Sequence, residues 1–253
     1  EPSPSRDHTE NMLAAMGATV TRETLADGRH RVAVDGEVEL EPLTLTVPAD
    51  PSSAAFVLVA ALRAPGSRVR LPGVGLNATR AGLFDVLARM GARIAIDNRR
   101  TLGGEPVGDL VVEAGALRGI DVEAAIAPTL IDEYPILAVA AAHAVGRTVM
   151  RGIGELRVKE TDRIAAMAAG LDACGVGVEA GEDWLAVSGT GGEAPAGGAV
   201  VDADHDHRIA MSFAVLGLAA AAPVRVRGAE TIATSFPGFV ELMTALGARL
   251  ETA

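Results

Sequence analysis

One pattern recurs three times along the chain and restricts its fold to an assembly of similar units. In each copy an aspartate precedes a long, alanine-rich apolar stretch, which is typical of a capped helix buried in a core. The three aspartates are Asp50, Asp132 and Asp206. We therefore expect a helix to begin near each of them.

The elements after each first helix recur in the same order. A short strand, a glycine-containing turn and a second, amphipathic helix follow, and that helix ends at a glycine suited to the left-handed conformation. These glycines are Gly91, Gly175 and Gly247. Each lies at nearly the same distance from its aspartate, which predicts a repeat of about 70–85 residues of mixed helix and strand. The expected strands span 67–71, 93–97, 147–151, 177–180, 224–227 and 249–252.

A shorter fourth copy opens the chain. Residues 9–16, Gly17 and the residues after it match a second helix, its terminal glycine and a strand. The pairs Asp27-Gly28 and Asp35-Gly36 are typical of hairpin turns.

The start of the chain predicts a division into two parts. The chain begins at Glu1 rather than at a methionine, in a Pro-Ser stretch and inside a repeat. We expect residues 1–47 to be the C-terminal remnant of another, similar domain and residues 48–253 to be a complete three-repeat domain. The predicted fold class is mixed α/β, with three units about a pseudo-threefold axis.

Composition argues against several classes of protein. Hydrophobic residues are 49% of the chain and aromatic residues only 3%, so small and branched aliphatic side chains must build the core. No apolar run reaches the ~18 residues of a membrane span, and no signal peptide is visible. The single cysteine, Cys174, favours a reducing cytoplasm. The net charge of -11 argues against a nucleic-acid surface, so a small anionic ligand would need a local cluster of cations.

The choice of basic residues is uneven. Lys159 is the only lysine among 22 basic residues, and it lies in the most densely charged run, 157–163. Arginine serves equally well where charge alone is needed, but not where a compact ammonium or a titratable amine is needed. A solvated helix start would explain the charged run and leave the lysine unexplained.

Charged residues near the expected helix starts predict an anion site. If the units surround one axis, their first helices run parallel and their N-termini, which attract anions, converge on one face. Lys159 and Arg163 are four residues apart and would share one helix face, and Arg208 follows the third aspartate. Asp132 and Glu160 lie among these cations, which suits a base and an acid that move protons beside an anionic substrate.

Simpler roles stay open for the same residues. Asp132 could be only a helix cap, and Glu160 only a solvated acid in a first turn. The run 202–207 is rich in aspartate and histidine, but a helix cap explains it better than a metal site because no distant ligand is evident. Cys174, just before a glycine turn, is interpreted as a small buried thiol.

Five segments resemble the signature sequences of a known family. They are 5–10, 131–135, 156–163, 206–211 and 233–237. They resemble the EPSP synthase (3-phosphoshikimate 1-carboxyvinyltransferase) family, and its bacterial class II members in particular, over essentially the whole chain. The resemblance implies the enolpyruvyl-transferase fold, in which each of two domains holds three βαβαββ units about a pseudo-threefold axis.

The resemblance also implies an activity. Members of the family transfer the enolpyruvyl group of phosphoenolpyruvate to the 5-hydroxyl of shikimate 3-phosphate, in aromatic amino-acid biosynthesis, with no metal or cofactor. By resemblance, Asp132 and Glu160 are catalytic, and Arg163 and Arg208 bind phosphoenolpyruvate. The implied ligands of shikimate 3-phosphate are Arg6, Asp132 and Lys159.

Parts of the family pattern are absent. The chain lacks the N-terminal Lys-Ser…Arg loop, a further phosphoenolpyruvate-binding arginine and the Ser-x-Gln motif, and Thr234 stands where some relatives carry a lysine. We therefore expect this chain to hold only part of the active site. We expect it to need the N-terminal part of the same protein and to be inactive alone.

Two alternatives stay open. UDP-N-acetylglucosamine enolpyruvyl transferase shares the fold and phosphoenolpyruvate, but it typically uses a cysteine on a mobile loop, and Cys174 stands in a different setting. A non-catalytic, repeat-built interaction module would bind no small anions. Titration with shikimate 3-phosphate and with UDP-N-acetylglucosamine distinguishes the three.

Overall fold

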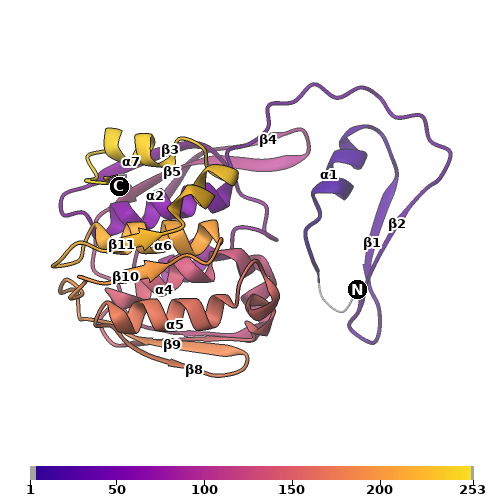
Figure 1. The fold of residues 1–253 in the computed structure, drawn as a ribbon. Coiled ribbons are helices and arrows are strands. Elements are labelled where there is room, and N and C mark those ends of the chain that lie inside the picture. Colours follow the sequence, from indigo (N-terminus) through magenta and orange to yellow (C-terminus); the bar gives the residue numbers. More distant parts are fainter. Residues whose placement is uncertain (1–3, 252–253) are drawn as a thin grey trace.

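The computed structural model describes residues 4–251 and shows a larger body with a smaller lobe beside it (Figure 1). The lobe holds α1 (His8–Ala15), β1 (Val20–Thr24) and β2 (His30–Val34). Its two strands pair antiparallel through the predicted turn at Asp27-Gly28. Residues 35–48 then run to the body without helix or strand.

Polar contacts at the start of α1 join the lobe to the body. Asn77 of the body donates from Nδ2 to Asp7 Oδ1 at 2.6 Å and to Glu105 Oε2 at 3.0 Å. Glu105 Oε1 accepts from Asn11 Nδ2 at 3.1 Å. The turn before Glu105 needs glycine at Gly104, because a Cβ there would lie 2.7 Å from the carbonyl oxygen of Asn11. These contacts hold the N-terminal segment against the body.

The body consists of three successive units that share one order of elements. In the first unit, Ala49 pairs in parallel with Val74, α2 follows, and the sheet order is β3-β5-β4 with antiparallel pairs. Its elements are α2 (Pro51–Arg63), β3 (Arg68–Gly75), α3 (Gly82–Arg89), β4 (Arg93–Leu102) and β5 (Glu105–Glu113).

The second unit repeats this plan. Its first strand, β6, pairs in parallel with β7, and β9 and β8 continue the sheet antiparallel. The elements are β6 (Asp121–Val122), α4 (Tyr134–Ala142), β7 (Arg147–Arg151), α5 (Arg163–Ala173), β8 (Gly177–Ala180) and β9 (Trp184–Ser188). Short 3-10 helices precede α4 and α5, namely η1 (Ala124–Thr129), η2 (Ile131–Glu133) and η3 (Gly154–Val158).

The third unit begins in the same way, with β10 pairing in parallel with β11. Its elements are β10 (Val200–Asp202), α6 (His207–Gly217), β11 (Arg225–Arg227), η4 (Ala229–Thr234) and α7 (Phe239–Ala245). The strand expected over 249–252 is absent from residues 249–251, and its last residue lies outside the described part. In the other units the corresponding strand, β4 or β8, pairs with the next strand of the chain, and residues up to 251 include no such partner.

Most of the predicted repeat signals are confirmed. Asp50 caps α2 through hydrogen bonds from the backbone N–H groups of Ser52 and Ser53, and Asp206 caps α6 in the same way. The glycines after α3, α5 and α7 all have positive φ, at 94° for Gly91, 79° for Gly175 and 99° for Gly247. The partial copy also appears, as α1, a glycine and β1.

Two further local predictions are wrong. Asp132 does not cap a helix: it lies in η2, and α4 begins at Tyr134 with no side-chain cap. The 3-10 turn occupies the place of the cap, so the carboxylate of Asp132 is available to other partners. Asp35-Gly36 forms no hairpin turn, because β2 ends at Val34 and residues 36–48 contain no strand to pair with it.

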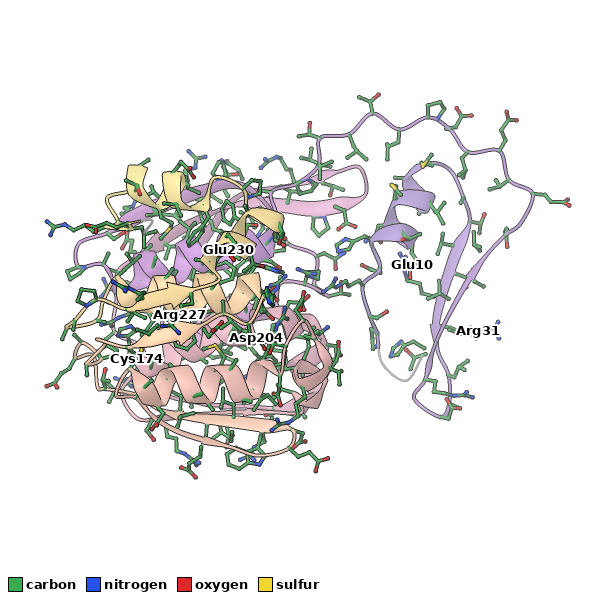
Figure 2. The ribbon with its side chains drawn as sticks, in the orientation of Figure 1. Glu10, Arg31, Cys174, Asp204, Arg227 and Glu230 are labelled. Carbon is green, nitrogen blue, oxygen red and sulfur yellow. The ribbon has the colours of Figure 1, made fainter. Side chains whose placement is uncertain are left out.

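The first helices of the three units form the centre of the body. α2, α4 and α6 contact one another, and every residue of α4 is buried. Alanines and glycines permit this close packing: a Cβ on Gly170 of α5 would lie 2.2 Å from the ring of Phe213 in α6. Cys174, which Figure 2 labels, is the buried thiol that we expected. Burial raises the pKa of its thiol. None of the helices in residues 4–251 is long and apolar enough to span a membrane.

A buried histidine gives the fold a testable pH dependence. Burial, aided by the charge of Arg63, lowers the pKa of His143 to about 4. In the unfolded chain, His143 has an ordinary pKa of about 6.5 and takes up a proton below that pH. In the folded chain its lowered pKa keeps it neutral, so acid favours the unfolded state. We expect the free energy of unfolding to fall by up to ~3 kcal/mol between about pH 7 and about pH 4 on this account.

Urea unfolding of the wild type and of His143→Gln, measured at both ends of this pH range, tests the expectation. The variant cannot take up this proton, so its stability should depend less steeply on pH. Equal pH slopes for the two proteins would show that His143 does not contribute.

Candidate functional site

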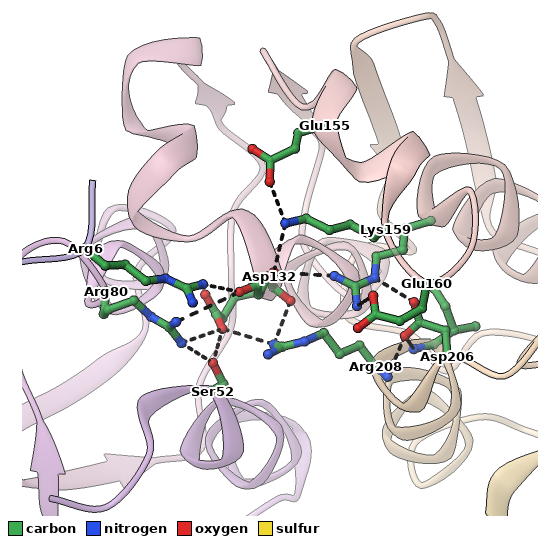
Figure 3. A network of polar contacts seen from close by, with 12 residues as sticks. Arg6, Ser52, Arg80, Asp132, Glu155, Lys159, Glu160, Asp206 and Arg208 are labelled. Carbon is green, nitrogen blue, oxygen red and sulfur yellow. Dashed lines mark hydrogen bonds and ion pairs between the residues drawn. The ribbon is translucent and has the colours of Figure 1, made fainter. Parts of the chain in front are cut away.

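The structure brings all six sequence-predicted site residues together around Asp132, on the side of the body where its helices begin (Figure 3). They are Arg6, Asp132, Lys159, Glu160, Arg163 and Arg208. Arg6 comes from the segment before α1, Asp132 from η2, and Lys159 and Glu160 from the turn before α5. Arg163 opens α5, and Arg208 lies in the first turn of α6.

The carboxylate of Asp132 is surrounded by cations. Arg6 Nη2 donates to Oδ2, and Arg80 Nη1 lies 3.9 Å from the same oxygen. On the other side, Oδ1 is 3.5 Å from Arg163 Nη1 and 3.7 Å from Lys159 Nζ. Burial by itself would raise the pKa of Asp132, but the charges of Arg208, Arg6 and Lys159 and the Arg6 hydrogen bond outweigh it and lower that pKa below its usual value. Asp132 is therefore a carboxylate at neutral pH.

The lone lysine lies in an irregular turn. η3 ends at Val158, α5 begins at Arg163, and Asp162 caps α5 by accepting from the backbone N–H of Ala165. Lys159 and Arg163 thus do not share a helix face, contrary to our expectation, because the cap interrupts the helix between them. Lys159 Nζ donates to Glu155 Oε1 at 2.5 Å, and its side chain is only 23% exposed. It is not a solvated helix start.

Arg163 carries the most deeply buried cation of the site. Its side chain is 1% exposed, and its Nε donates to Asp206 Oδ2 at 2.7 Å. Its Nη2 donates to Glu160 Oε2 at 2.5 Å. Within residues 4–251, its buried Nη1 makes no hydrogen bond and only a longer ion-pair contact with Asp132 Oδ1 at 3.5 Å. A buried donor without a hydrogen bond is costly, which is a reason to expect an acceptor from a ligand at this point.

Three residues around the site escaped the sequence reasoning. Arg80, Ser52 and Glu133 lie beside Asp132, and each is at least largely buried. The repeat itself could have indicated Arg80, because Arg80 and Arg163 both lie where the second helix of a unit begins. Glu133 could have been noticed as a charge directly before an entirely apolar helix. Ser52 gives no comparable signal.

The arrangement is suited to hold small polyanions beside a carboxylate. Five cations face the same space, namely Arg6, Arg80, Lys159, Arg163 and Arg208. Arginine can grip carboxylate or phosphate oxygens with two parallel hydrogen bonds, and lysine makes a point contact. Among residues 4–251, no group of three or more metal-ligating side chains is placed to hold a metal ion.

The sequence pattern of the EPSP synthase (3-phosphoshikimate 1-carboxyvinyltransferase) family matches residues 1–243. The chain belongs to this family. The 3-phosphoshikimate 1-carboxyvinyltransferase of Paramagnetospirillum magneticum is 58% identical over 247 residues, which are 98% of this chain and 55% of that protein. The protein of the same name from Sphingopyxis alaskensis is 53% identical over 246 residues, which are 97% of this chain and 55% of that protein. The chain thus spans little more than half the length of these relatives.

Solved structures agree with the family assignment. The EPSP synthase of Acinetobacter baumannii superposes with a TM-score of 0.93 at 43% identity, over 99% of this chain and 56% of that chain. The enolpyruvyl transferase NikO of Streptomyces tendae has a TM-score of 0.72 at 24% identity, over 98% of this chain and 54% of that chain, a likeness of fold alone. The mixed α/β, enolpyruvyl-transferase fold expected from the sequence is confirmed.

Replacing the central carboxylate tests the electrostatics of the site. We expect Asp132→Asn to bind inorganic phosphate about tenfold more tightly, a gain of ~1.4 kcal/mol, because the cations lose an internal competitor. Calorimetric titration of the chain measures the change. Asp121→Asn is the matched control, because Asp121 pairs with Arg151 on the surface and is 62% exposed. Unchanged or weaker phosphate binding by Asp132→Asn would contradict the expectation.

Proposed function

We propose that the protein to which this chain belongs transfers the enolpyruvyl group of phosphoenolpyruvate to the 5-hydroxyl of shikimate 3-phosphate, releasing phosphate. The observation that carries the proposal is the cluster of five cations around Asp132, in which the buried Nη1 of Arg163 makes no hydrogen bond within residues 4–251 and lies 3.5 Å from Asp132 Oδ1. Both substrates are polyanions, and such a cluster matches them. The family and the printed names of its relatives support the same reaction.

Each site residue has a proposed role. Arg6, Lys159 and Asp132 bind shikimate 3-phosphate, with the cations on its phosphate or oxygens and Asp132 at the reacting hydroxyl. Arg163 and Arg208 bind phosphoenolpyruvate, and their forks suit its phosphate and carboxylate. Asp132 and Glu160 are the catalytic residues. Holding both anions in reactive contact supplies much of the rate, since positioning replaces a bimolecular encounter.

The chemistry divides into addition and elimination. The 5-hydroxyl oxygen bonds to C2 of phosphoenolpyruvate while Asp132 takes the hydroxyl proton and Glu160 gives a proton to C3. In the tetrahedral intermediate, the bond between C2 and the phosphate oxygen then breaks. Glu160 takes a proton back from the methyl group as the carbon–carbon double bond re-forms. The leaving phosphate takes the proton held by Asp132, so both residues return to their starting state. The reaction needs no redox change, in line with a proposed absence of cofactor and metal.

The charges around Asp132 would couple its basicity to substrate binding. In the free site, Arg208, Arg6 and Lys159 lower the pKa of Asp132, so its carboxylate is a weak base. Anionic substrates that engage these cations would offset their charge and raise that pKa. Proton removal would then become efficient only when both substrates are present.

We extend the proposal to the organisation of the protein. Residues 48–253 are one domain of three units, and residues 1–47 belong to a second, similar domain that supplies Arg6 to the site. The rest of the same protein supplies the missing substrate contacts, and no nucleic acid or membrane takes part. A cytoplasmic location agrees with the single buried thiol.

An assay of the whole protein, meaning the complete polypeptide that contains these 253 residues, tests the reaction. We expect phosphate release in equal amount to the enolpyruvyl ether formed from shikimate 3-phosphate and phosphoenolpyruvate, followed by NMR. Turnover with UDP-N-acetylglucosamine instead would assign the alternative enzyme of this fold. Absence of binding to all three anions, measured by calorimetry, would favour an interaction module.

The lone lysine gives a sharper test of the site. Lys159→Arg keeps the charge but replaces a compact ammonium by a larger planar fork in a position that is only 23% exposed. Misplacement of substrates by about 1 Å can cost about 100-fold in rate. We expect a loss of that order in kcat/KM of the whole protein, with little change in melting temperature.

The control is Arg225→Lys, the reverse exchange at an exposed position of β11. It should leave kinetics and melting temperature unchanged, since such surface substitutions are worth within about 0.5 kcal/mol. Wild-type turnover by Lys159→Arg would show that Lys159 does not bind or position the substrates.

A further inference from the structure

A buried carboxylate beside the site, Glu133, belongs to none of the roles assigned above. Its residue is 3% exposed, and it forms no side-chain cap on α4. A carboxylate at this depth is tolerated only when it is paired and hydrogen-bonded. Its partners therefore indicate why it is there.

The partners of Glu133 come from the other two units. Ser52 Oγ, in the first turn of α2, donates to Glu133 Oε1 at 2.5 Å. Arg208 Nη1, in the first turn of α6, donates to the same oxygen at 3.2 Å. Glu133 itself precedes α4 in the second unit. One carboxylate oxygen thus joins the three units where their central helices begin.

Ser52 extends this contact to a second arginine. Arg80 Nη2 donates to Ser52 Oγ at 2.5 Å, while the hydroxyl hydrogen of Ser52 goes to Glu133. Arg80 Nη2 is also 3.8 Å from Glu133 Oε1, and Arg80 Nη1 lies 3.9 Å from Asp132 Oδ2. Figure 3 shows Arg80, Ser52 and Arg208 arranged in a row beneath Asp132. The side chains of both arginines are largely buried, at 13% and 15% exposure.

The side-chain hydrogen bonds of Arg208 to the described residues use only one nitrogen of its guanidinium, Nη1. Its Nη1 donates to Glu133 and to the backbone carbonyl oxygen of Asp132, the latter at 2.9 Å. Within residues 4–251, its Nε and Nη2 donate to no protein acceptor. The Nε–Nη2 edge is therefore fixed in direction and open, the arrangement that a two-point grip on an oxyanion requires.

We infer that Glu133 is a positioning residue that, together with Ser52, fixes Arg208 and Arg80 in the orientation for binding the second anionic substrate. The inference rests on the proposed function for the identity of that anion, phosphoenolpyruvate. Glu133 touches no substrate in this role. It acts through Arg208 by fixing the direction of the Nε–Nη2 edge. Its charge also offsets those of the Arg80 and Arg208 guanidinium groups.

Three variants of the whole protein test the inference, each titrated by calorimetry with phosphoenolpyruvate and, separately, with shikimate 3-phosphate. Glu133→Ala removes the acceptor and should weaken phosphoenolpyruvate binding about tenfold or more. Binding of shikimate 3-phosphate should stay within about threefold, since Arg6 and Lys159 do not contact Glu133. Glu133→Gln keeps an oxygen that accepts from Ser52 and Arg208, and it should recover most of the affinity.

Ser52→Ala gives an independent reading if Glu133→Ala does not fold. It should weaken phosphoenolpyruvate binding about threefold, because Arg80 and Glu133 lose their common partner. Ser53→Ala is the matched control: it is the next residue of the same helix turn, and its hydroxyl bonds only to Asp50 among the described residues. It should bind both anions like the wild type.

The outcomes separate the inference from the proposed function. Unchanged phosphoenolpyruvate affinity in both Glu133→Ala and Ser52→Ala overturns the inference. Equal weakening of both anions with a lower melting temperature also overturns it, since that result means a purely structural role. A wild type that binds both anions but forms no product defeats the proposed reaction and leaves the comparison of variants intact.

Discussion

The buried ion pair between Arg163 and Asp206 is the interaction on which the rest of the site depends. Arg163 opens α5 in the second unit, Asp206 caps α6 in the third, and their side chains are 1% and 0% exposed. Removing one partner of such a pair costs about 3–5 kcal/mol, because the other charge stays buried alone. The pair therefore fixes how the two units meet. It also turns Nη1 of Arg163, which makes no hydrogen bond within residues 4–251, toward Asp132.

The site reverses the charge of the molecule locally. The chain carries a net charge of -11, which repels anions at long range, whereas five cations face Asp132. The acids among them, such as Asp132, Glu155 and Glu160, pair with these cations. An arriving anion can exchange an internal ion pair for an external one. Every buried charge then keeps a partner when the anion binds, so a highly charged cluster is compatible with a stable fold.

The sequence predicted the repeated order of elements and five of the six residues that meet, because capping aspartates, terminal glycines and residue types are local signals. The sixth, Arg6, was implied only by the family resemblance. It could not predict features that depend on packing between units. Ser52 and Glu133 are 81 residues apart, and only the meeting of α2 and α4 makes them partners. The prediction that Lys159 and Arg163 share a helix face was wrong for a local reason. The cap at Asp162 interrupts the charged run that we interpreted as one helix.

The three aspartates show how a repeat provides both structure and chemistry. Asp50 uses its carboxylate to cap α2, and Asp206 divides its own between capping α6 and holding Arg163. At the equivalent position of the second unit, the turn η2 separates Asp132 from the N-terminus of α4. A carboxylate engaged in a cap has its lone pairs committed to backbone N–H groups. Loss of the cap in one copy therefore leaves the carboxylate of Asp132 open to a ligand, at the point where the other two copies hold the helix ends in place.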